Sequence, residues 1–134
     1  MRLIHQGKLL LLPLAAFLAA CNVTANPSPE DTAKRFLEAA HSGDPQAVKM
    51  FINERNPALF MLGSQVYTRV AEGAKGETRK HGAIKSIDTN VVAQNGGNAL
   101  VEASVTYEDG FVGTGNIPVE EVEGRWYYAP SQRN

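Results

Sequence analysis

Cysteine is almost absent from this chain. The single residue, Cys21, cannot form a disulfide within the chain or supply a cluster of thiolate ligands for a metal. Long apolar runs are also missing. The longest, Leu9–Leu18, is interrupted by Pro13 and is shorter than the roughly 20 residues that a membrane-spanning helix needs. The sequence has no Gly-x-Ser-x-Gly elbow, no phosphate-binding loop and no His/Cys/Glu cluster at metal-ligand spacing. We therefore expect no cofactor and no metal site.

The one cysteine directly follows the apolar run. Arg2 and Lys8 give a positive head, and small residues precede Cys21, a pattern typical of a secretory signal peptide over residues 1–20 that is cleaved. The sequence "LAAC" at 18–21 resembles the lipobox of bacterial lipoproteins. This resemblance implies that the Cys21 sulfur receives a diacylglycerol and that its freed amine is acylated, for example with palmitate. The alternative is an ordinary signal peptide followed by a chance cysteine.

The same resemblance implies that the protein is located in the bacterial cell envelope. Asn22 directly follows the cysteine. In such lipoproteins an aspartate at this position tends to keep the protein in the inner membrane, so we expect this chain at the outer membrane, facing the periplasm. Residues 21–29 are polar and contain prolines, which predicts a flexible tether, and residues 130–134 are predicted to be a disordered tail. The formal net charge of −1 gives no basis for nucleic-acid binding. The expected partners are the membrane, through Cys21, and a small apolar ligand or an envelope protein.

The period of the apolar residues changes once within the domain predicted over residues 30–129. Helices are predicted to start at Glu30, at Asp44-Pro45 and at Asn56-Pro57, and residues 73–80, which include two glycines, are expected to form a loop. Alternation with period two then predicts strands over 82–94, 98–108, 111–122 and 125–129, joined by glycine-containing turns. Helices followed by a meander predict an α+β domain in which N-terminal helices pack on a curved four-stranded antiparallel sheet.

This order of elements resembles the nuclear transport factor 2-like superfamily, a cystatin-like α+β cone. The resemblance rests on a Gly-Asp helix junction at 43–44, an Asp-Gly turn at 109–110 and a Gly-x-Trp at 124–126. Within the superfamily, the chain looks like small bacterial lipoproteins of unknown function once labelled lumazine-binding-like. The resemblance implies a cone with an apolar pocket. This fold occurs in isomerases, dehydratases, transport factors and binding modules, so the fold alone does not determine the function.

Few residues of the domain suggest catalysis. His41 is expected to cap carbonyls at a helix end, and His81 to lie on the surface. The cationic segment 75–85 around His81 is expected to be solvated, with contact to anionic headgroups or to an acidic partner as the alternative. Asp88 shares a polar strand face with Ser86 and Asn90, which indicates the solvent side of a sheet rather than a buried base. We therefore expect no catalytic residue, and Trp126 to be a structural anchor.

The strand face that carries Gly113 and Gly115 has no side chains at these two positions, which leaves volume unfilled. This predicts an apolar cavity between the sheet and the helices. Its expected lining has only tyrosine hydroxyls as polar side chains; the candidates are Phe60, Val66, Tyr67, Val105, Tyr107 and Ile117. The sequence thus favours a non-enzymatic lipoprotein that binds a small apolar ligand or a protein partner. The alternatives are an envelope scaffold or toxin-neutralising inhibitor, and an isomerase- or dehydratase-like enzyme built around Asp88 with Tyr67 or Tyr107.

Overall fold

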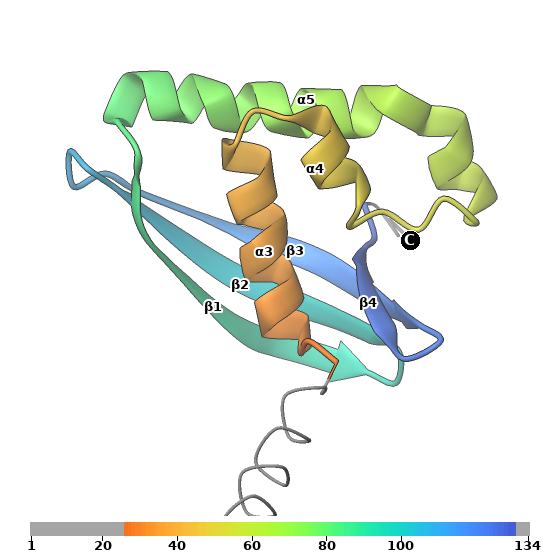
Figure 1. Ribbon diagram of the computed structural model, residues 1–134. Coiled ribbons are helices and arrows are strands. Elements are labelled where there is room, and N and C mark those ends of the chain that lie inside the picture. The colour runs from red at the N-terminus through yellow and green to blue at the C-terminus, as the bar shows by residue number, and fades with distance from the viewer. Residues whose placement is uncertain (1–25, 131–134) are drawn as a thin grey trace, which may run out of the picture.

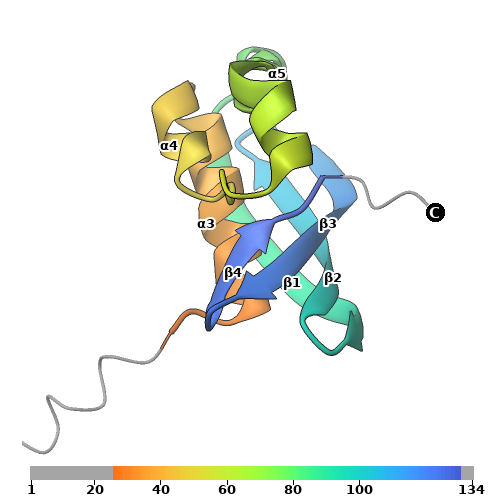
Figure 2. The ribbon, with the colours of Figure 1, turned by 90° about the vertical axis from the view of Figure 1, so that its right-hand side faces the viewer.

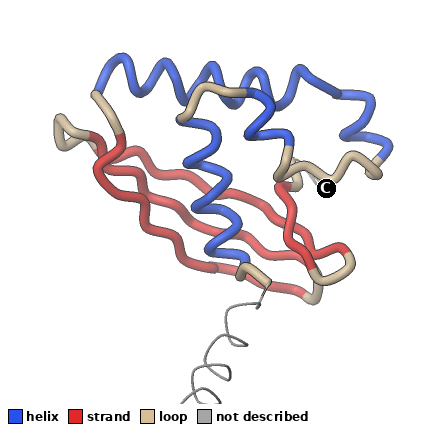
Figure 3. Tube along the Cα trace, viewed as in Figure 1, coloured by secondary structure: helices blue, strands red, loops and turns tan. Residues whose placement is uncertain are grey.

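A computed structural model describes residues 26–130, in which three helices precede four strands (Figure 1). The helices are α3 (Pro29–His41), α4 (Pro45–Lys49) and α5 (Pro57–His81). The strands are β1 (Ile84–Asn95), β2 (Asn98–Tyr107), β3 (Val112–Val122) and β4 (Arg125–Tyr128). The strands form one layer and the helices lie together on one side of it (Figure 3), so the predicted α+β class is confirmed. The predicted signal peptide, Cys21, residues 22–25 of the tether and residues 131–134 lie outside the described residues.

The first two helices begin at capping residues that the sequence supplies. The Ser28 hydroxyl accepts a hydrogen bond from the backbone N–H of Asp31 at 3.1 Å, and Pro29 follows as the first helical residue. At α4 the carboxylate of Asp44 accepts from the backbone N–H of Gln46 at 2.9 Å. Each cap satisfies a backbone donor that has no partner within its helix. Helix α4 starts where the sequence predicts, whereas α3 starts one residue earlier, at Pro29 instead of Glu30.

The third helix is longer than predicted, because residues 73–80 continue α5 instead of forming a loop. Gly73 and Gly76 each cost a helix interior up to about 1 kcal/mol relative to alanine. The helix offsets that cost by burying Ala71 and by placing Arg79, Lys80 and His81 in its last turn, where cations favour the helix dipole. It ends at Gly82, whose φ of +86° is a conformation that suits glycine.

The four strands form an antiparallel sheet in sequence order, β1-β2-β3-β4, with the helices on its inner face (Figure 2). Val101 pairs with Ile117, Ala103 with Gly115 and Val105 with Gly113. The inner face of β2 is buried, whereas the Ser86, Asp88 and Asn90 side chains of β1 are exposed on the outer face, as their spacing predicts. The register therefore places two glycines directly opposite a buried alanine and a buried valine.

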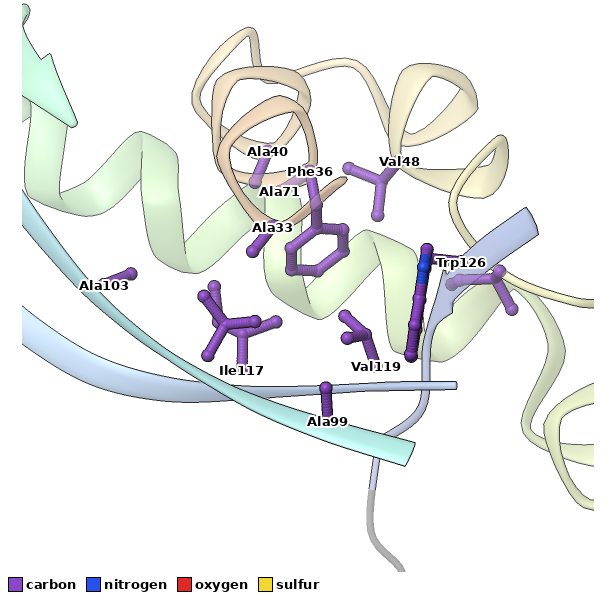
Figure 4. Packing of buried hydrophobic residues seen from close by; sticks show 12 residues of the cluster. Ala33, Phe36, Ala40, Val48, Ala71, Ala99, Ala103, Ile117, Val119 and Trp126 are labelled. Carbon is purple, nitrogen blue, oxygen red and sulfur yellow. The ribbon is translucent and has the colours of Figure 1, made fainter. Parts of the chain in front are cut away.

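Helix α3 lies at the centre of the packing and contacts α5, α4 and all four strands. Its Phe36 ring stacks on Tyr128 of β4 with ring centroids 4.3 Å apart. Close by, Trp126 is only 8% exposed and belongs to the same buried cluster, as its predicted structural role requires (Figure 4). The start of the domain is thus held against its last strand by aromatic packing.

Candidate functional site

A cleft with a volume of about 390 Å³ lies between the helices and the inner face of the sheet. Helix α3 contributes Leu37, Ala40 and His41, and α5 contributes Val70, Gly73, Ala74 and Glu77. The sheet side comes from Ala103, Val105 and Tyr107 of β2 and from Phe111 and residues 113–117 of β3 and the turn before it. Most of these residues are apolar or lack a side chain, so the cleft suits a ligand that buries carbon.

Two glycines on β3 keep the cleft open. A methyl group added at Gly115 would meet no atom within 4 Å, and one added at Gly113 would only touch the rings of Phe111 and Tyr107 at 3.8 and 4.0 Å. Neither glycine has a positive φ. The backbone therefore does not require glycine at Gly115, and the missing side chain leaves space that ordinary core packing would fill.

His41 and Tyr107 form a hydrogen-bonded pair in the wall of the cleft. The imidazole Nδ1 of His41 lies 2.7 Å from the Leu37 carbonyl oxygen, and its Nε2 lies 2.8 Å from the Tyr107 hydroxyl. A carbonyl oxygen only accepts, so Nδ1 carries a hydrogen and donates it. In the neutral imidazole Nε2 is then the acceptor, and Tyr107 donates its hydroxyl hydrogen to it. His41 thus bonds to a helix carbonyl as predicted, and it also bonds to the Tyr107 side chain, a contact that sequence spacing did not suggest.

Burial raises the pKa of Tyr107 above its usual value of 10.0, and the negative charge of Glu77 adds to the rise. Tyr107 is 3% exposed. Because the low-dielectric surroundings disfavour the phenolate, this side chain stays a neutral hydroxyl at physiological pH. It is suited to orient a ligand by hydrogen bonding rather than to act as a base.

A second cluster borders the cleft through Phe111 and joins the end of α5 to the turn between β2 and β3. His81 stacks on Phe111, with ring centroids 3.9 Å apart and planes 8° apart, and its Nδ1 lies 2.7 Å from Oδ2 of Asp109. The backbone N–H of Phe111 donates to the other oxygen of Asp109 at 2.8 Å. This backbone hydrogen bond, with the bond to His81, lowers the pKa of Asp109 below its usual 3.8. The cluster fixes Phe111 at the rim of the cleft.

Only some of the residues predicted to line a pocket line the cleft. Val105, Tyr107 and Ile117 line the cleft. Val66 and Tyr67 are partly buried against the core cluster and are not among the described lining residues, and the Phe60 side chain lies outside the described residues. Asp88 is exposed on the outer face of the sheet, so it does not form the buried pair with Tyr67 or Tyr107 that the enzyme alternative requires.

The expectation that tyrosine hydroxyls are the only polar side chains of the lining is wrong, because His41 and Glu77 also line the cleft. The sequence interpretation missed Glu77 because it assigned residues 73–80, which contain two glycines, to a loop. The spacing of Val66, Val70 and Ala74, followed by basic residues and Gly82, is the signal that could have extended the helix. The pairing of His41 with Tyr107 had no such signal, because the two residues are 66 positions apart.

His41 also borders a second, polar groove of about 710 Å³ between α3, the end of α5 and the start of β1. The cationic side chains predicted as a cluster, Lys75, Arg79, Lys80 and Lys85, are exposed. Among residues 26–130, no group of three or more His, Cys, Asp or Glu residues is placed to hold a metal ion. Within the same range, no helix has both the length and the apolar character needed to cross a membrane.

Comparisons with known proteins identify a structural relative but no sequence relative. No protein-family model matches the chain, and no curated protein matches it. Among solved structures, it is similar to a crystal structure from Campylobacter jejuni described as a "putative NTF2-like transpeptidase". The TM-score is 0.67 at 20% sequence identity, over 76% of this chain and 97% of that one. The arrangement of helices and sheet agrees with this likeness, and the chain has the nuclear transport factor 2-like fold.

Proposed function

We propose that this chain is a lipid-anchored lipoprotein of the bacterial cell envelope whose domain binds a small apolar ligand without catalysing a reaction. The fold itself is compatible with either a binding module or an enzyme, so the choice depends on the site. The observation that carries the proposal is the cleft of about 390 Å³, which is mostly apolar and has Gly115 opening onto empty space. Such a cleft, with one oriented hydroxyl at Tyr107, matches the usual composition of small-molecule sites.

The site gives little support to catalysis. Acid–base catalysis favours a group whose pKa lies near the working pH, whereas burial raises the pKa of the Tyr107 phenol further above neutrality. The structural relative is described as a "putative NTF2-like transpeptidase", but the described lining of the cleft contains no serine or cysteine, and its one threonine, Thr114, is exposed. The cleft has two candidate acids or bases, His41 and Glu77. Both ring nitrogens of His41 already have partners in Leu37 and Tyr107, and the Glu77 carboxylate lies 3.8 and 3.7 Å from Lys80 and His81. A binding role therefore fits this site better than a proton-transfer enzyme.

The anchor is proposed on sequence grounds. The positive head, the apolar run and "LAAC" at 18–21 support lipidation at Cys21. Several acyl chains on one residue would hold the protein stably, where a single chain binds only marginally. Residues 22–28 would separate the anchor from α3, which begins at Pro29. We place the domain in the periplasm, at the outer membrane.

Titration with the neutral fluorophore N-phenyl-1-naphthylamine tests the binding proposal. Its emission should rise as it enters the cleft, and Gly115→Leu should abolish that rise, because the added side chain would occupy the space next to Gly115. Asn90→Leu is the matched control, since it adds the same side chain to the exposed outer face. Equal emission from wild type and Gly115→Leu, with both folded by circular dichroism, would place the fluorophore outside the cleft and reject the proposal.

A further inference from the structure

We propose that the cleft takes an apolar amine, that is, an apolar ring or short chain bearing a protonated nitrogen, in preference to a carboxylate of the same shape. This inference rests on the proposed function and adds the chemical class of the ligand. Two polar groups of the lining carry it: the hydroxyl of Tyr107 and the carboxylate of Glu77. They come from opposite sides of the cleft, β2 and α5.

The first argument is the direction of the hydrogen bonds that end at Tyr107. Nδ1 of His41 donates to the Leu37 carbonyl, so Nε2 of the neutral imidazole accepts the hydroxyl hydrogen of Tyr107. A tyrosine hydroxyl has only one hydrogen, and this contact uses it. The oxygen keeps a lone pair, so a ligand can bond to Tyr107 only by donating an N–H or O–H. The cleft therefore favours a donor over an acceptor.

The second argument is the charge of the lining. Among the described residues that line the cleft, Glu77 is the only Asp, Glu, Lys or Arg. Its contacts with Lys80 and His81 are long, at 3.8 and 3.7 Å, and half-exposed pairs of this kind contribute little. The charge of Glu77 is felt at Tyr107, whose pKa it helps to raise. A carboxylate ligand would meet this negative charge without a lining Lys or Arg to offset it, whereas an ammonium would be attracted.

The aromatic rings of the lining add to the preference. Tyr107 and Phe111 both line the cleft, with ring centroids 6.1 Å apart. A cation close to an aromatic ring is attracted by the negative potential of its face. An ammonium group that donates to the Tyr107 oxygen would lie in a region bounded by these rings and by Glu77. The apolar part of the ligand would then occupy the space beside Gly115.

Calorimetry with three naphthalene probes of matched shape tests this inference. The probes are 2-naphthylmethylamine, 2-naphthalenemethanol and 2-naphthoate, and the buffer is held near pH 8, above the usual pKa of histidine, of about 6.5. The amine is then protonated and the acid ionised. We expect the amine to bind most tightly, the alcohol next and the carboxylate least. Added salt should weaken binding of the amine and leave binding of the alcohol unchanged, because the amine is charged and the alcohol is not.

Two substitutions separate the two arguments. Glu77→Gln should lower the affinity for the amine by about two- to five-fold, leave the affinity for the alcohol unchanged and raise the affinity for the carboxylate. Tyr107→Phe should lower the affinity for both the amine and the alcohol, because it removes the hydroxyl oxygen to which both would donate a hydrogen bond. Glu72→Gln is the matched control: Glu72 is an exposed carboxylate on the same helix and is not part of the described lining. It should leave all three affinities unchanged.

The outcomes distinguish this inference from the proposed function. Equal affinities for the three probes, or tightest binding of the carboxylate, would overturn the amine preference and leave an apolar binding cleft in place. The same applies if Glu77→Gln and Glu72→Gln weaken the amine equally. If none of the probes binds wild-type protein, the proposed function is rejected and the amine preference with it.

Discussion

The imidazole of His81 lies parallel to the ring of Phe111, with the two ring centroids 3.9 Å apart. This stack joins the last residue of α5 to the turn that precedes β3. Three further contacts reinforce the junction: the His81–Asp109 side-chain bond of 2.7 Å, a bond from the Asp109 N–H to the His81 carbonyl and one from the Glu108 N–H to the Ala83 carbonyl. Phe111 lines the cleft, so the strength of this junction bears on the shape of the site.

Asp109→Asn should make the protein less sensitive to acid. In the folded protein the pKa of Asp109 lies below its usual 3.8, so its ionised form stabilises the fold above that pH. That stabilisation is lost as the pH falls from about 4 through the lower folded pKa. Chemical denaturation between about pH 5 and pH 2 should therefore show a smaller loss of unfolding free energy in Asp109→Asn than in wild type. Asp88→Asn, on the exposed outer face, should behave like wild type, and an equal acid response from all three proteins would contradict the contribution of Asp109.

Two glycine-to-alanine substitutions should change stability in opposite directions. Gly82 has a φ of +86°, and an added methyl group would lie 2.7 Å from a carboxylate oxygen of Glu108. Gly82→Ala should lower the free energy of unfolding by about 1–2 kcal/mol. Gly115→Ala meets no atom and should raise it by about 0.4–1 kcal/mol, because alanine restricts the unfolded chain. Urea unfolding of the two variants measures both effects, and a loss of stability in Gly115→Ala would show that this position needs glycine after all.

Trp126→Ala should lower the free energy of unfolding by about 3–5 kcal/mol, as truncation of a large buried aromatic does. Trp126 belongs to the buried cluster with Phe36 and Val119, and its removal would leave a cavity between α3 and β4. Because Trp126 is the only tryptophan, unfolding should be followed by far-ultraviolet circular dichroism. Val92→Ala is the control, since Val92 is 48% exposed. Similar unfolding curves for the two variants would argue against an anchoring role for Trp126.

Cys21→Ala should abolish incorporation of labelled palmitate in growing bacterial cells and release the domain from the membrane fraction. The thiol is the proposed acceptor of the lipid, so no other residue should replace it. Ser28→Ala, which removes only a helix cap, is the control that should stay labelled. Export of wild-type protein without any label would show that the amino-terminal segment is an ordinary signal peptide.

Local patterns determined much of the fold. The Asp44-Pro45 start of α4, the Gly96-Gly97 turn between β1 and β2, and the alternation that buries Val101 and Val105 each depend on residues close together in the sequence. Steric and hydrogen-bonding preferences of this kind act over a few residues, so the α+β class and the order of the strands could be predicted. The helical state of residues 73–80 was predicted wrongly, because the two glycines were given more weight than the helical spacing of Val66, Val70 and Ala74. In the structure, burial of Ala71 and favourable charges in the last turn outweigh the two glycines.

The site was decided by tertiary structure. The sequence placed Tyr107 and the two glycines of β3 on the cleft side, because strand periodicity alone assigns residues to a face. It could not place His41 beside Tyr107, or Glu77 in the same lining, since these residues come from different elements brought together only by the packing of α3 and α5 over the sheet. Hydrogen-bond direction and charge depend on distances of a few ångströms, which residue spacing along one element does not fix. The sequence alone therefore predicted an apolar cavity with tyrosine hydroxyls, and the tertiary structure added His41 and Glu77, which set the hydrogen-bond direction and the charge of its lining.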